Sequence, residues 1–356
     1  MITINMRSTA MKVQAQGVGS VYNDQVRLVK EKLGGKYKVT ENARGKFDII
    51  HFHTVNLNYY FERLLTKRRS VSVGYVHLLP DTVDGSIKLP WLFTKAFYRY
   101  LLAFYNSMDY LVTVNPQIID KIRKYGIKKP KVCYIPNFVS ERDFYEKSNI
   151  EKTIIREEYG FSEDDFVVLC VGQTQTRKGI FDFIETAKKS PEIKFVWAGG
   201  FSFGKITDGY EKIRKIMAKP PENVTFLGLI DRNDMVNVYN IADVFFLPSY
   251  DELFPMTILE AVACRLPVVL RDIDAYKNIL SGGYLSGNTP DDFSAALTEL
   301  KNDRGEYDYW RDRAWECHKR YDEDAISGQW DRFYNAAFNK SANPQRIISD
   351  EIVNIS

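Results

Sequence analysis

The sequence predicts an α/β protein with two Rossmann-like domains, each a doubly wound parallel sheet. Its 356 residues are too many for one ordinary hydrophobic core and suit two domains of about 150 to 180 residues each. Short apolar runs alternate with stretches of helical periodicity in both halves, which is typical of parallel strands joined by crossover helices. A polar segment over residues 140–153 separates the two series, and we interpret it as a hinge.

The first domain is predicted to span residues 1–150. Its short apolar runs indicate strands, and its longer stretches with apolar residues every three or four positions indicate helices. In chain order we expect a strand at 2–6, a helix at about 23–33, strands at 47–53 and 71–76, a helix at 89–106, a strand at 110–114 and a helix at 116–125.

The second domain is predicted to span residues 151–320. The run 166–171 predicts a strand, which a loop over 172–179 joins to a helix starting near residue 181. A buried strand at 244–247 ends at Pro248, and a helix follows at 257–263. Trp and Tyr residues at helical spacing between 307 and 338 indicate a packing face, and the polar tail over 341–356 is predicted to be loosely ordered.

Composition excludes several classes of protein. Apolar residues make up 45% and charged residues 27%, as in soluble globular proteins. The four cysteines are scattered without a CxxC pair, so the sequence indicates neither a disulfide framework nor a zinc site and favours a reducing cytosol. The N-terminal segment lacks the features of a signal peptide, and no stretch reaches the length of an apolar transmembrane helix.

The charge is divided unevenly along the chain. Residues 1–150 carry 24 Lys and Arg against 12 Asp and Glu, whereas the remainder carries 25 against 34. A basic domain beside an acidic one indicates that the first domain contacts an anionic surface, either nucleic acid or membrane. No nucleic-acid motif accompanies the charge, so we expect an anionic membrane and no nucleic acid.

One segment of the first domain, residues 88–105, is both aromatic and basic. This composition suits a helix lying in a bilayer interface, and the basic cluster at 67–69 supports that interpretation. The alternative is a large core helix of the first domain, and part of the face can serve both purposes. We therefore expect a cytoplasmic protein held peripherally on the inner face of the cell membrane. The membrane contacts are predicted to be Trp91, Phe93, Lys95, Phe97 and Arg99.

Two glutamates, Glu252 and Glu260, are separated by seven residues and follow the buried strand 244–247. One lies in the strand-to-helix loop and the other about a turn inside the helix, so both can face the crevice where open parallel sheets bind ligands. Carboxylates accept hydrogen bonds from sugar hydroxyls, and helix-start amides suit a diphosphate, which favours a nucleotide-sugar. By itself such a pair is more often solvated surface.

The second half of the chain resembles the nucleotide-sugar domain of the family 4 retaining glycosyltransferases. The matching segments occur in the order of that family: 171–173 with 177–179, then 195–200, 224–228 and 239–249, and finally the two glutamates. The resemblance extends over about residues 1–335. It implies the GT-B fold, in which two Rossmann-like domains face a central cleft. It also implies that a C-terminal helix, residues 321–340, crosses back to the first domain.

The resemblance assigns roles in binding the donor. Glu252 is expected to bind the transferred sugar near C3, and Glu260 the ribose. Gln173 stands where the family usually has Arg, so Arg177 or Lys178 is expected to contact the phosphates; the alternative is a loop whose cations face solvent. Pro255 replaces the usual Gly and removes one amide donor. The donor-binding residues are predicted to be Gly19, Gly172, Gln173, Arg177, Lys178, Phe254, Pro255, Met256, Thr257 and Glu260.

The first half contributes acceptor-side candidates. The segment with Gly17, Val18 and Gly19 resembles the glycine-rich loop of the family, where a backbone without side chains approaches the donor and acceptor. His77, at the end of the strand 71–76, matches the histidine that the family places beside the reacting sugar. His51 and His53 point the same way from one strand, and we expect His53 to line the cleft.

Together these features predict a retaining hexosyltransferase. The resemblance implies front-face transfer with His77, Glu252 and Lys178 as the catalytic residues, and no metal or other cofactor is expected because cations of the protein serve the diphosphate. Residues 14–20 and 252–260 resemble bacterial glycosyl-diacylglycerol synthases. The expected substrates are a UDP-linked glucose or galactose and a lipid-linked sugar acceptor, monoglucosyldiacylglycerol. The alternatives are a cell-wall or capsular glycan or a protein acceptor, and a non-catalytic sugar-nucleotide-binding protein.

Overall fold

The structure, a computed structural model, describes residues 1–9, 17–80, 91–201, 204 and 207–340, and these form two compact units. The first unit contains the described residues up to 137 and those from 323 onward; the second contains residues 138–322. The predicted boundary at residue 150 lies later than this division, because residues 138–149 pack with the second unit.

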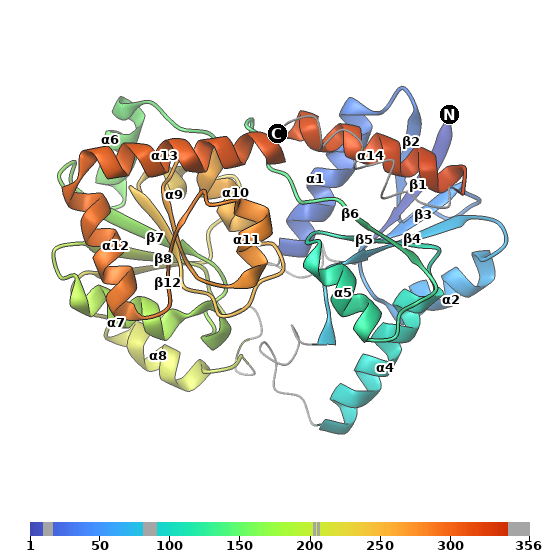
Figure 1. The fold of residues 1–356 in the computed structure, drawn as a ribbon, viewed down its shortest axis with the longest axis horizontal. Helices are drawn as coiled ribbons and strands as arrows, with labels where there is room; N and C mark the ends of the chain where they lie inside the picture. The colour runs from blue at the N-terminus through green and yellow to red at the C-terminus, as the bar shows by residue number, and fades with distance from the viewer. Residues whose placement is uncertain (10–16, 81–90, 202–203, 205–206, 341–356) are drawn as a thin grey trace. The chain divides into compact units, whose positions relative to one another are not determined.

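The first unit is built on a six-stranded sheet with the order β2-β1-β3-β4-β5-β6 (Figure 1). All of its neighbouring strands are parallel, as the alternating pattern predicts. Strand β2 was not predicted, because its sequence YKVTE has little apolar content and is only partly buried. The strands are β1 (Ile2–Arg7), β2 (Tyr37–Glu41), β3 (Ile49–Phe52), β4 (Val71–Val76), β5 (Tyr110–Thr113) and β6 (Lys131–Tyr134).

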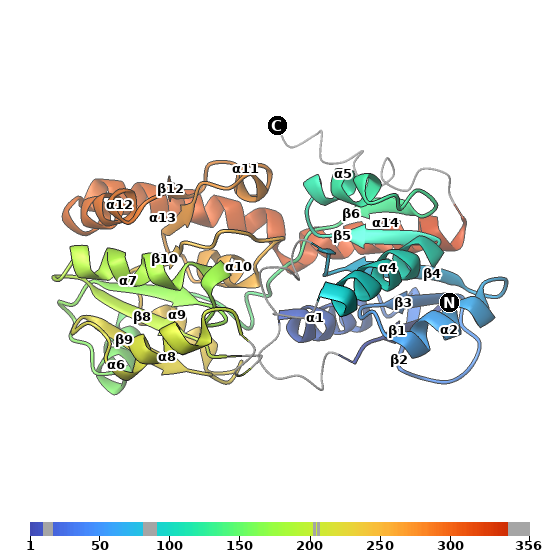
Figure 2. The ribbon, with the colours of Figure 1, turned by 90° about the horizontal axis from the view of Figure 1, so that it is seen from below.

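The helices of the first unit pack in two groups. Helices α1 and α14 contact each other, and α2 contacts α4 (Figures 1 and 2). The C-terminal helix α14 belongs to this unit, where its Asp331 binds Lys36 and Tyr37 and its Tyr334 binds Gln25. The helices are α1 (Gly17–Lys32), α2 (Leu57–Thr66), α4 (Trp91–Ser107), α5 (Gln117–Lys124) and α14 (Glu323–Phe338).

The second unit has a parallel six-stranded sheet with the order β12-β11-β10-β7-β8-β9. Strands β7 and β10 are buried along their whole length, which explains their uninterrupted apolar sequences VVLCV and VFFL. The strands are β7 (Val167–Val171), β8 (Lys194–Ala198), β9 (Val224–Gly228), β10 (Val244–Leu247), β11 (Val268–Arg271) and β12 (Leu285–Gly287).

Helices cover this second sheet, and two of them begin with a complete capping box, Ser148 with Glu151 and Thr289 with Asp292. The helices are α6 (Asn149–Glu158), α7 (Ile180–Lys189), α8 (Tyr210–Ala218), α9 (Met235–Asn240), α10 (Met256–Ala263), α11 (Asp274–Leu280), α12 (Pro290–Asn302) and α13 (Arg304–His318). Single 3₁₀ turns lie at η2 (Thr176–Lys178) and η4 (Lys319–Tyr321).

Each sheet has one point at which the strand order reverses. In the second unit the chain leaves the central strand β7 towards β8 and β9 and then returns to place β10 on its other side. In the first unit the same reversal lies between β1 and β3. Ligands of doubly wound sheets bind beyond the carboxyl ends of the strands at such reversals. We therefore expect the donor to bind at the loops after β7 and β10.

Candidate active site

The loops after β7 and β10 bring three charged residues together at the reversal point of the second unit. Glu252, in the loop after β10, is buried and accepts a hydrogen bond from the Lys178 ammonium. Arg177 Nη1 lies 3.8 Å from Glu252 Oε2, and Ser249 Oγ donates to Glu252 Oε1 at 2.7 Å. The sequence placed these residues in the two loops, and the structure brings their charged groups into contact.

Backbone contacts fix the two loops against each other. Gly179 has φ +76°, and a Cβ there would lie 2.1 Å from the carbonyl oxygen of Pro248, so only glycine permits this approach. The Arg177 carbonyl accepts from Tyr250 N at 2.9 Å and from Ser249 Oγ at 3.1 Å. The positions of Lys178 and Arg177 beside Glu252 are therefore set by the main chain.

The charge state of Glu252 results from two opposing effects. Burial acts to raise the pKa of its carboxyl, but the charges of Lys178 and Arg177 and the hydrogen bonds from Lys178 and Ser249 outweigh burial and hold that pKa below its ordinary value. Glu252 is thus a buried, ionised acceptor with a fixed orientation, which is the chemistry needed to bind sugar hydroxyls.

Glu260 lies in the second turn of α10, as the sequence predicted, and is also buried. Arg232 Nη1 donates to Glu260 Oε1 at 2.8 Å, and the Tyr239 hydroxyl donates to Glu260 Oε2 at 2.7 Å. Burial is the larger cause and the charge of Glu260 the next, and together they raise the pKa of Tyr239 well above its ordinary value. The tyrosine therefore stays protonated and can donate. Neither Arg232 nor Tyr239 was singled out from the sequence.

The start of α10 follows from local sequence. Pro255 is the N-cap residue with extended backbone, and the helix begins at Met256, so Met256 and Thr257 are the first helical residues. The first amides of a helix have no intrahelical acceptor. Phe254 is buried, and its ring centroid lies 5.3 Å from that of Tyr321.

Gln173, which stands in the position of an expected cation, takes part in a side-chain pair. Its Oε1 accepts from Gln175 Nε2 at 3.1 Å, and Gln175 is fully buried. The adjacent Gly172 carbonyl accepts from Trp197 Nε1 at 3.1 Å. The start of the loop is therefore neutral and held by hydrogen bonds, while the cations are concentrated at its end.

A second ionic network supports the loop after β10 and was missed by sequence reasoning. Arg271, at the end of β11, binds the Asp182 carboxylate and donates to the Pro248 carbonyl at 3.1 Å. Its guanidinium also lies 3.9 Å from the centroid of the Tyr250 ring. A charged residue ending an otherwise apolar strand was the available signal, since an arginine in a buried strand needs such partners.

In the first unit His77 follows β4, as predicted, and its ring stacks on Tyr75 with centroids 4.1 Å apart and planes 2° from parallel. His53 follows β3, and its ring lies 6.1 Å from that of His77. Burial lowers the pKa of His77 to about 3, so the imidazole is neutral at physiological pH.

His51 and His53 point the same way from the chain, as predicted, and their ring centroids are 4.3 Å apart. His51 Nδ1 lies 3.0 Å from the Tyr334 hydroxyl, so His51 packs under α14. His53 is buried, and neither of its ring nitrogens has a partner among the described residues.

The glycine-rich segment differs from its prediction. Helix α1 begins at Gly17, about six residues before the predicted start at Asn23, so Gly17, Val18 and Gly19 form the first helical turn and not a loop before it. The first amides of a helix have no intrahelical acceptor, so this segment can still bind an anion through its backbone. The side chain of Val18 lies outside the described residues.

The aromatic and basic segment forms α4, and its two halves differ in burial. Phe93 is 71% exposed, Lys95 and Arg99 are exposed, and Phe97 is half-buried, whereas further along Leu101 and Phe104 are buried in the core. The second half of α4 is therefore a core helix, and the first half is exposed, as the interface interpretation requires. The side chain of Trp91 lies outside the described residues, and no described helix has the length and apolarity needed to cross a bilayer.

Comparison with known families agrees with this architecture. The profile described as "Glycosyl transferases group 1" matches residues 151–316, and that described as "Glycosyltransferase Family 4" matches residues 26–142. The structure of Anabaena HepE, solved in complex with UDP and glucose, superposes with a TM-score of 0.76 at 15% identity, covering 94% of this chain and 100% of that one. Similarity at that level of identity concerns the fold.

Two relatives extend over most of the chain. An alpha-galactosylglucosyldiacylglycerol synthase of Streptococcus pneumoniae is 41% identical over 333 residues, which cover 94% of this chain and 89% of the relative. A processive diacylglycerol alpha-glucosyltransferase of Acholeplasma laidlawii is 27% identical, covering 81% and 84%. The chain therefore belongs to the family 4 glycosyltransferases and has their GT-B fold.

Proposed function

We propose that this enzyme transfers a hexose from a UDP-sugar to a glycosyl-diacylglycerol in a membrane, with retention of the anomeric configuration. The observation that carries the proposal is the 41% identity to a galactosylglucosyldiacylglycerol synthase along nearly the whole of both chains. The name of that relative favours galactose as the transferred sugar and a glucosyl-diacylglycerol as the acceptor. The resemblance to the family supports retention.

In this proposal the second unit binds the donor. Lys178 and Arg177 would contact the diphosphate together with the first amides of α10, and Glu252 would accept from hydroxyls of the transferred sugar. Glu260, held by Arg232 and Tyr239, would accept from the ribose. Stabilisation of the charge that develops on the leaving diphosphate is the main electrostatic task of such a transfer, and fixed cations suit it.

By the resemblance to the family, His77 of the first unit would lie beside the reacting sugar and His53 would contact the acceptor. A neutral His77 imidazole can donate or accept one hydrogen bond without adding charge, which suits the positioning of an acceptor hydroxyl. Gly17 and Gly19, at the start of α1, would face the phosphates or the acceptor through their backbone.

We also propose that the enzyme works peripherally on the inner face of the cell membrane. The exposed N-terminal half of α4, with Phe93, Lys95 and Arg99, supports this because aromatic and cationic side chains together favour a bilayer interface.

The test is a transfer assay with purified protein, UDP-galactose or UDP-glucose, and monoglucosyldiacylglycerol in anionic vesicles. Acceptor-dependent release of UDP with a diglycosyl lipid as product is the expected result. Donor hydrolysis without a lipid product would redirect the search to glycan or protein acceptors, and absence of turnover with either donor would favour a sugar-nucleotide-binding protein. Lys178→Gln, which removes a proposed diphosphate contact, should lose most of the activity.

A further inference from the structure

Helix α2 of the first unit exposes its apolar face, whereas an ordinary surface helix buries that face. Its apolar residues Leu57, Phe61, Leu64 and Leu65 recur at the spacing i, i+4, i+7 and i+8, which places them on one face. In a globular protein such a face normally packs on the core. Here these side chains are 63%, 60%, 49% and 82% exposed, and we call them the outer face of α2.

The opposite side of α2 is polar and buried. Arg63 is 1% exposed, and its Nη2 donates to Asp109 Oδ1 at 3.0 Å while its Nε donates to the Ser107 carbonyl at 2.9 Å. Glu62 binds Arg7 of β1, with Nε at 3.1 Å from Oε1. Rotating α2 by half a turn would bury its four exposed apolar side chains, but it would also break both of these ion pairs. The ion pairs therefore fix the orientation of the helix.

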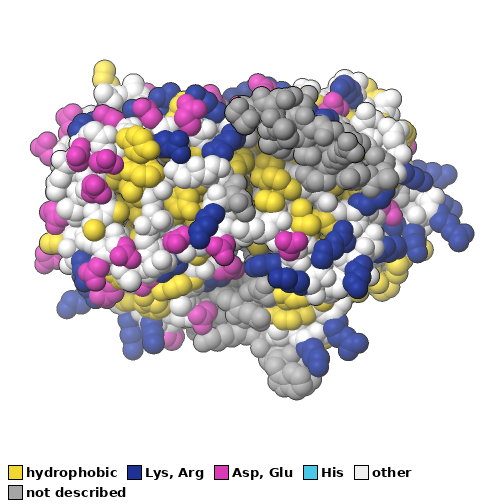
Figure 3. Space-filling view, in the orientation of Figure 1, with side chains coloured by type: hydrophobic (Ala, Val, Ile, Leu, Met, Phe, Trp, Pro, Cys, Tyr) yellow, Lys and Arg dark blue, Asp and Glu magenta, His cyan; other side chains and the backbone are white. Residues whose placement is uncertain are grey.

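A basic cluster follows immediately. Lys67, Arg68 and Arg69 are all exposed, and none of them forms an ion pair with another described residue. In Figure 3 blue and yellow side chains lie among white surface at the lower right of the view, where Figure 1 places α2 and α4, and little magenta is seen there. An apolar face bordered by unpaired cations is complementary to a surface that is apolar inside and anionic outside.

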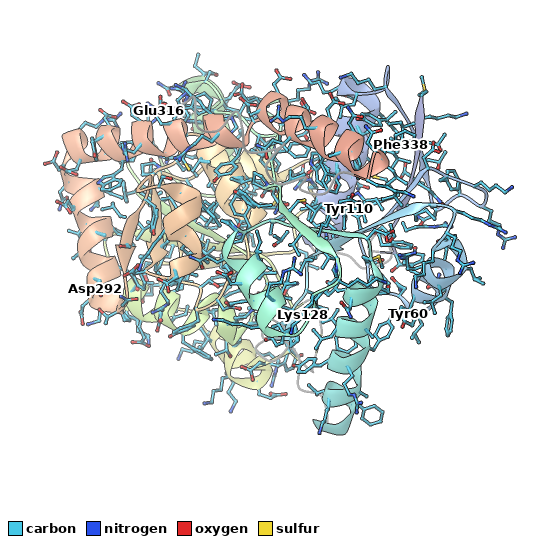
Figure 4. The ribbon with its side chains drawn as sticks, turned by 45° about the vertical axis from the view of Figure 1, so that its right-hand side comes forward. Tyr60, Tyr110, Lys128, Asp292, Glu316 and Phe338 are labelled. Carbon is cyan, nitrogen blue, oxygen red and sulfur yellow. The ribbon has the colours of Figure 1, made fainter. Side chains whose placement is uncertain are left out.

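Helix α4 continues this surface. The Tyr60 and Tyr100 rings of the two helices meet edge to face with centroids 6.0 Å apart, and Figure 4 shows Tyr60 on α2 beside α4. Phe93, Lys95 and Arg99 are exposed on the same helix as Tyr100. The two helices pack on each other, and both carry exposed apolar side chains next to exposed cations.

From this arrangement we propose that the outer face of α2, with the cluster at 67–69, is a docking surface that inserts into the headgroup region of an anionic lipid bilayer. The inference rests on the proposed function for its biological purpose, but its geometry does not depend on the reaction. A second copy of the chain is a poorer occupant, because pairing two such surfaces would bring their cationic clusters together.

The test is vesicle co-sedimentation of the full-length protein without donor or acceptor. Vesicles of equimolar phosphatidylcholine and phosphatidylglycerol are compared with vesicles of phosphatidylcholine alone. The double variant Phe61→Ser, Leu65→Ser removes two exposed apolar side chains and should reduce partition onto the anionic vesicles about tenfold or more. Substituting Arg68 and Arg69 with Gln should also weaken binding, with a loss that shrinks at high salt.

A matched control is available in the second unit. Ile150 and Ile154 are 75% and 52% exposed at i, i+4 on α6, so Ile150→Ser, Ile154→Ser makes the same kind of change elsewhere. This control should bind vesicles like the wild type. Thermal unfolding and the hydrolysis or transfer rate with a detergent-dispersed acceptor should be unchanged in both double variants, since exposed apolar residues add little stability.

Three results would overturn the inference. One is wild-type vesicle binding by the Phe61→Ser, Leu65→Ser variant; another is equal binding of the wild type to neutral and anionic vesicles. The third is a change of oligomeric state in that variant, seen by light scattering, without a change in vesicle binding. Failure of the proposed function looks different: vesicle binding that depends on α2 would persist, and no glycolipid would form.

Discussion

Replacing Glu252 with Gln should tighten the binding of UDP while slowing sugar transfer. In the structure the Glu252 carboxylate holds the Lys178 ammonium, and Arg177 Nη1 lies 3.8 Å from its other oxygen. Both cations are proposed contacts of the diphosphate, so an incoming diphosphate must compete with Glu252 for them. A carboxamide keeps the shape of the side chain but removes the competing charge.

The size of the effect follows from the contacts that change. A hydrogen bond to a charged group contributes about 1.5 to 3 kcal/mol and a neutral one about 1 kcal/mol. Exchanging one for the other at Lys178 should therefore favour UDP by about 0.5 to 2 kcal/mol, which is about 2- to 30-fold in Kd. Turnover should fall about 10- to 100-fold, because the sugar hydroxyls lose a charged acceptor.

Isothermal titration of UDP measures the first effect, and the transfer assay measures the second. Glu185→Gln is the matched control, because it removes the same charge from an exposed position on α7, where the side chain is 53% exposed. UMP should gain less than UDP from the Glu252 substitution, since it has no second phosphate to contact the cations. Unchanged or weaker UDP binding by a variant that unfolds at the wild-type temperature would refute the competition argument.

Three further predictions concern the other parts of the site. Glu260→Gln should weaken UDP binding about tenfold, as measured by titration, because the ribose loses an ionised acceptor; equal affinity would contradict the ribose role. Tyr75→Leu should lower kcat about tenfold by freeing the His77 ring, and should add an acid limb to the pH–rate profile as the His77 pKa rises toward about 6.5. Tyr75→Phe, which keeps the stack, should change neither. Burial lowers the pKa of His51 to about 3, so the unfolded state binds its proton first as the pH falls. The free energy of unfolding should then decrease by up to about 1.4 kcal/mol per pH unit for this residue between about pH 6.5 and 3, and urea titrations should find a shallower decrease in His51→Gln.

Periodicity and strand-end residues predicted most of the fold. The buried strands β7 and β10 are continuous apolar runs, and the sequence located both together with the helix carrying Glu260. Strand β2 was missed because an edge strand needs little apolar content. The start of α1 was misplaced because glycines read as a loop, although a helix begins at Gly17.

The candidate site was predicted only as a set of residues, not as a network. The spacing of the glutamates placed Glu252 in a loop, but nothing local indicates that Lys178 would reach it from 74 positions earlier in the chain. The partners Arg232 and Arg271 come from other elements, and only the strand order brings them close. Side-chain pairing across a sheet depends on topology, which a single sequence constrains weakly.

The uneven charge of the two halves has a structural counterpart in how their cations are used. In the second unit, Lys178, Arg232 and Arg271 each bind a buried or partly buried carboxylate, so their charge is neutralised until a ligand competes for it. In the first unit, the cluster at 67–69 lies exposed beside the outer face of α2 without ion pairs to the described residues. Paired cations suit a small anionic ligand that must displace a carboxylate, and this makes binding selective. Unpaired cations next to apolar side chains suit a broad anionic surface, where many weak contacts add up. Salt should therefore weaken vesicle binding more steeply than UDP binding, because the exposed cluster is screened and the buried pairs are not.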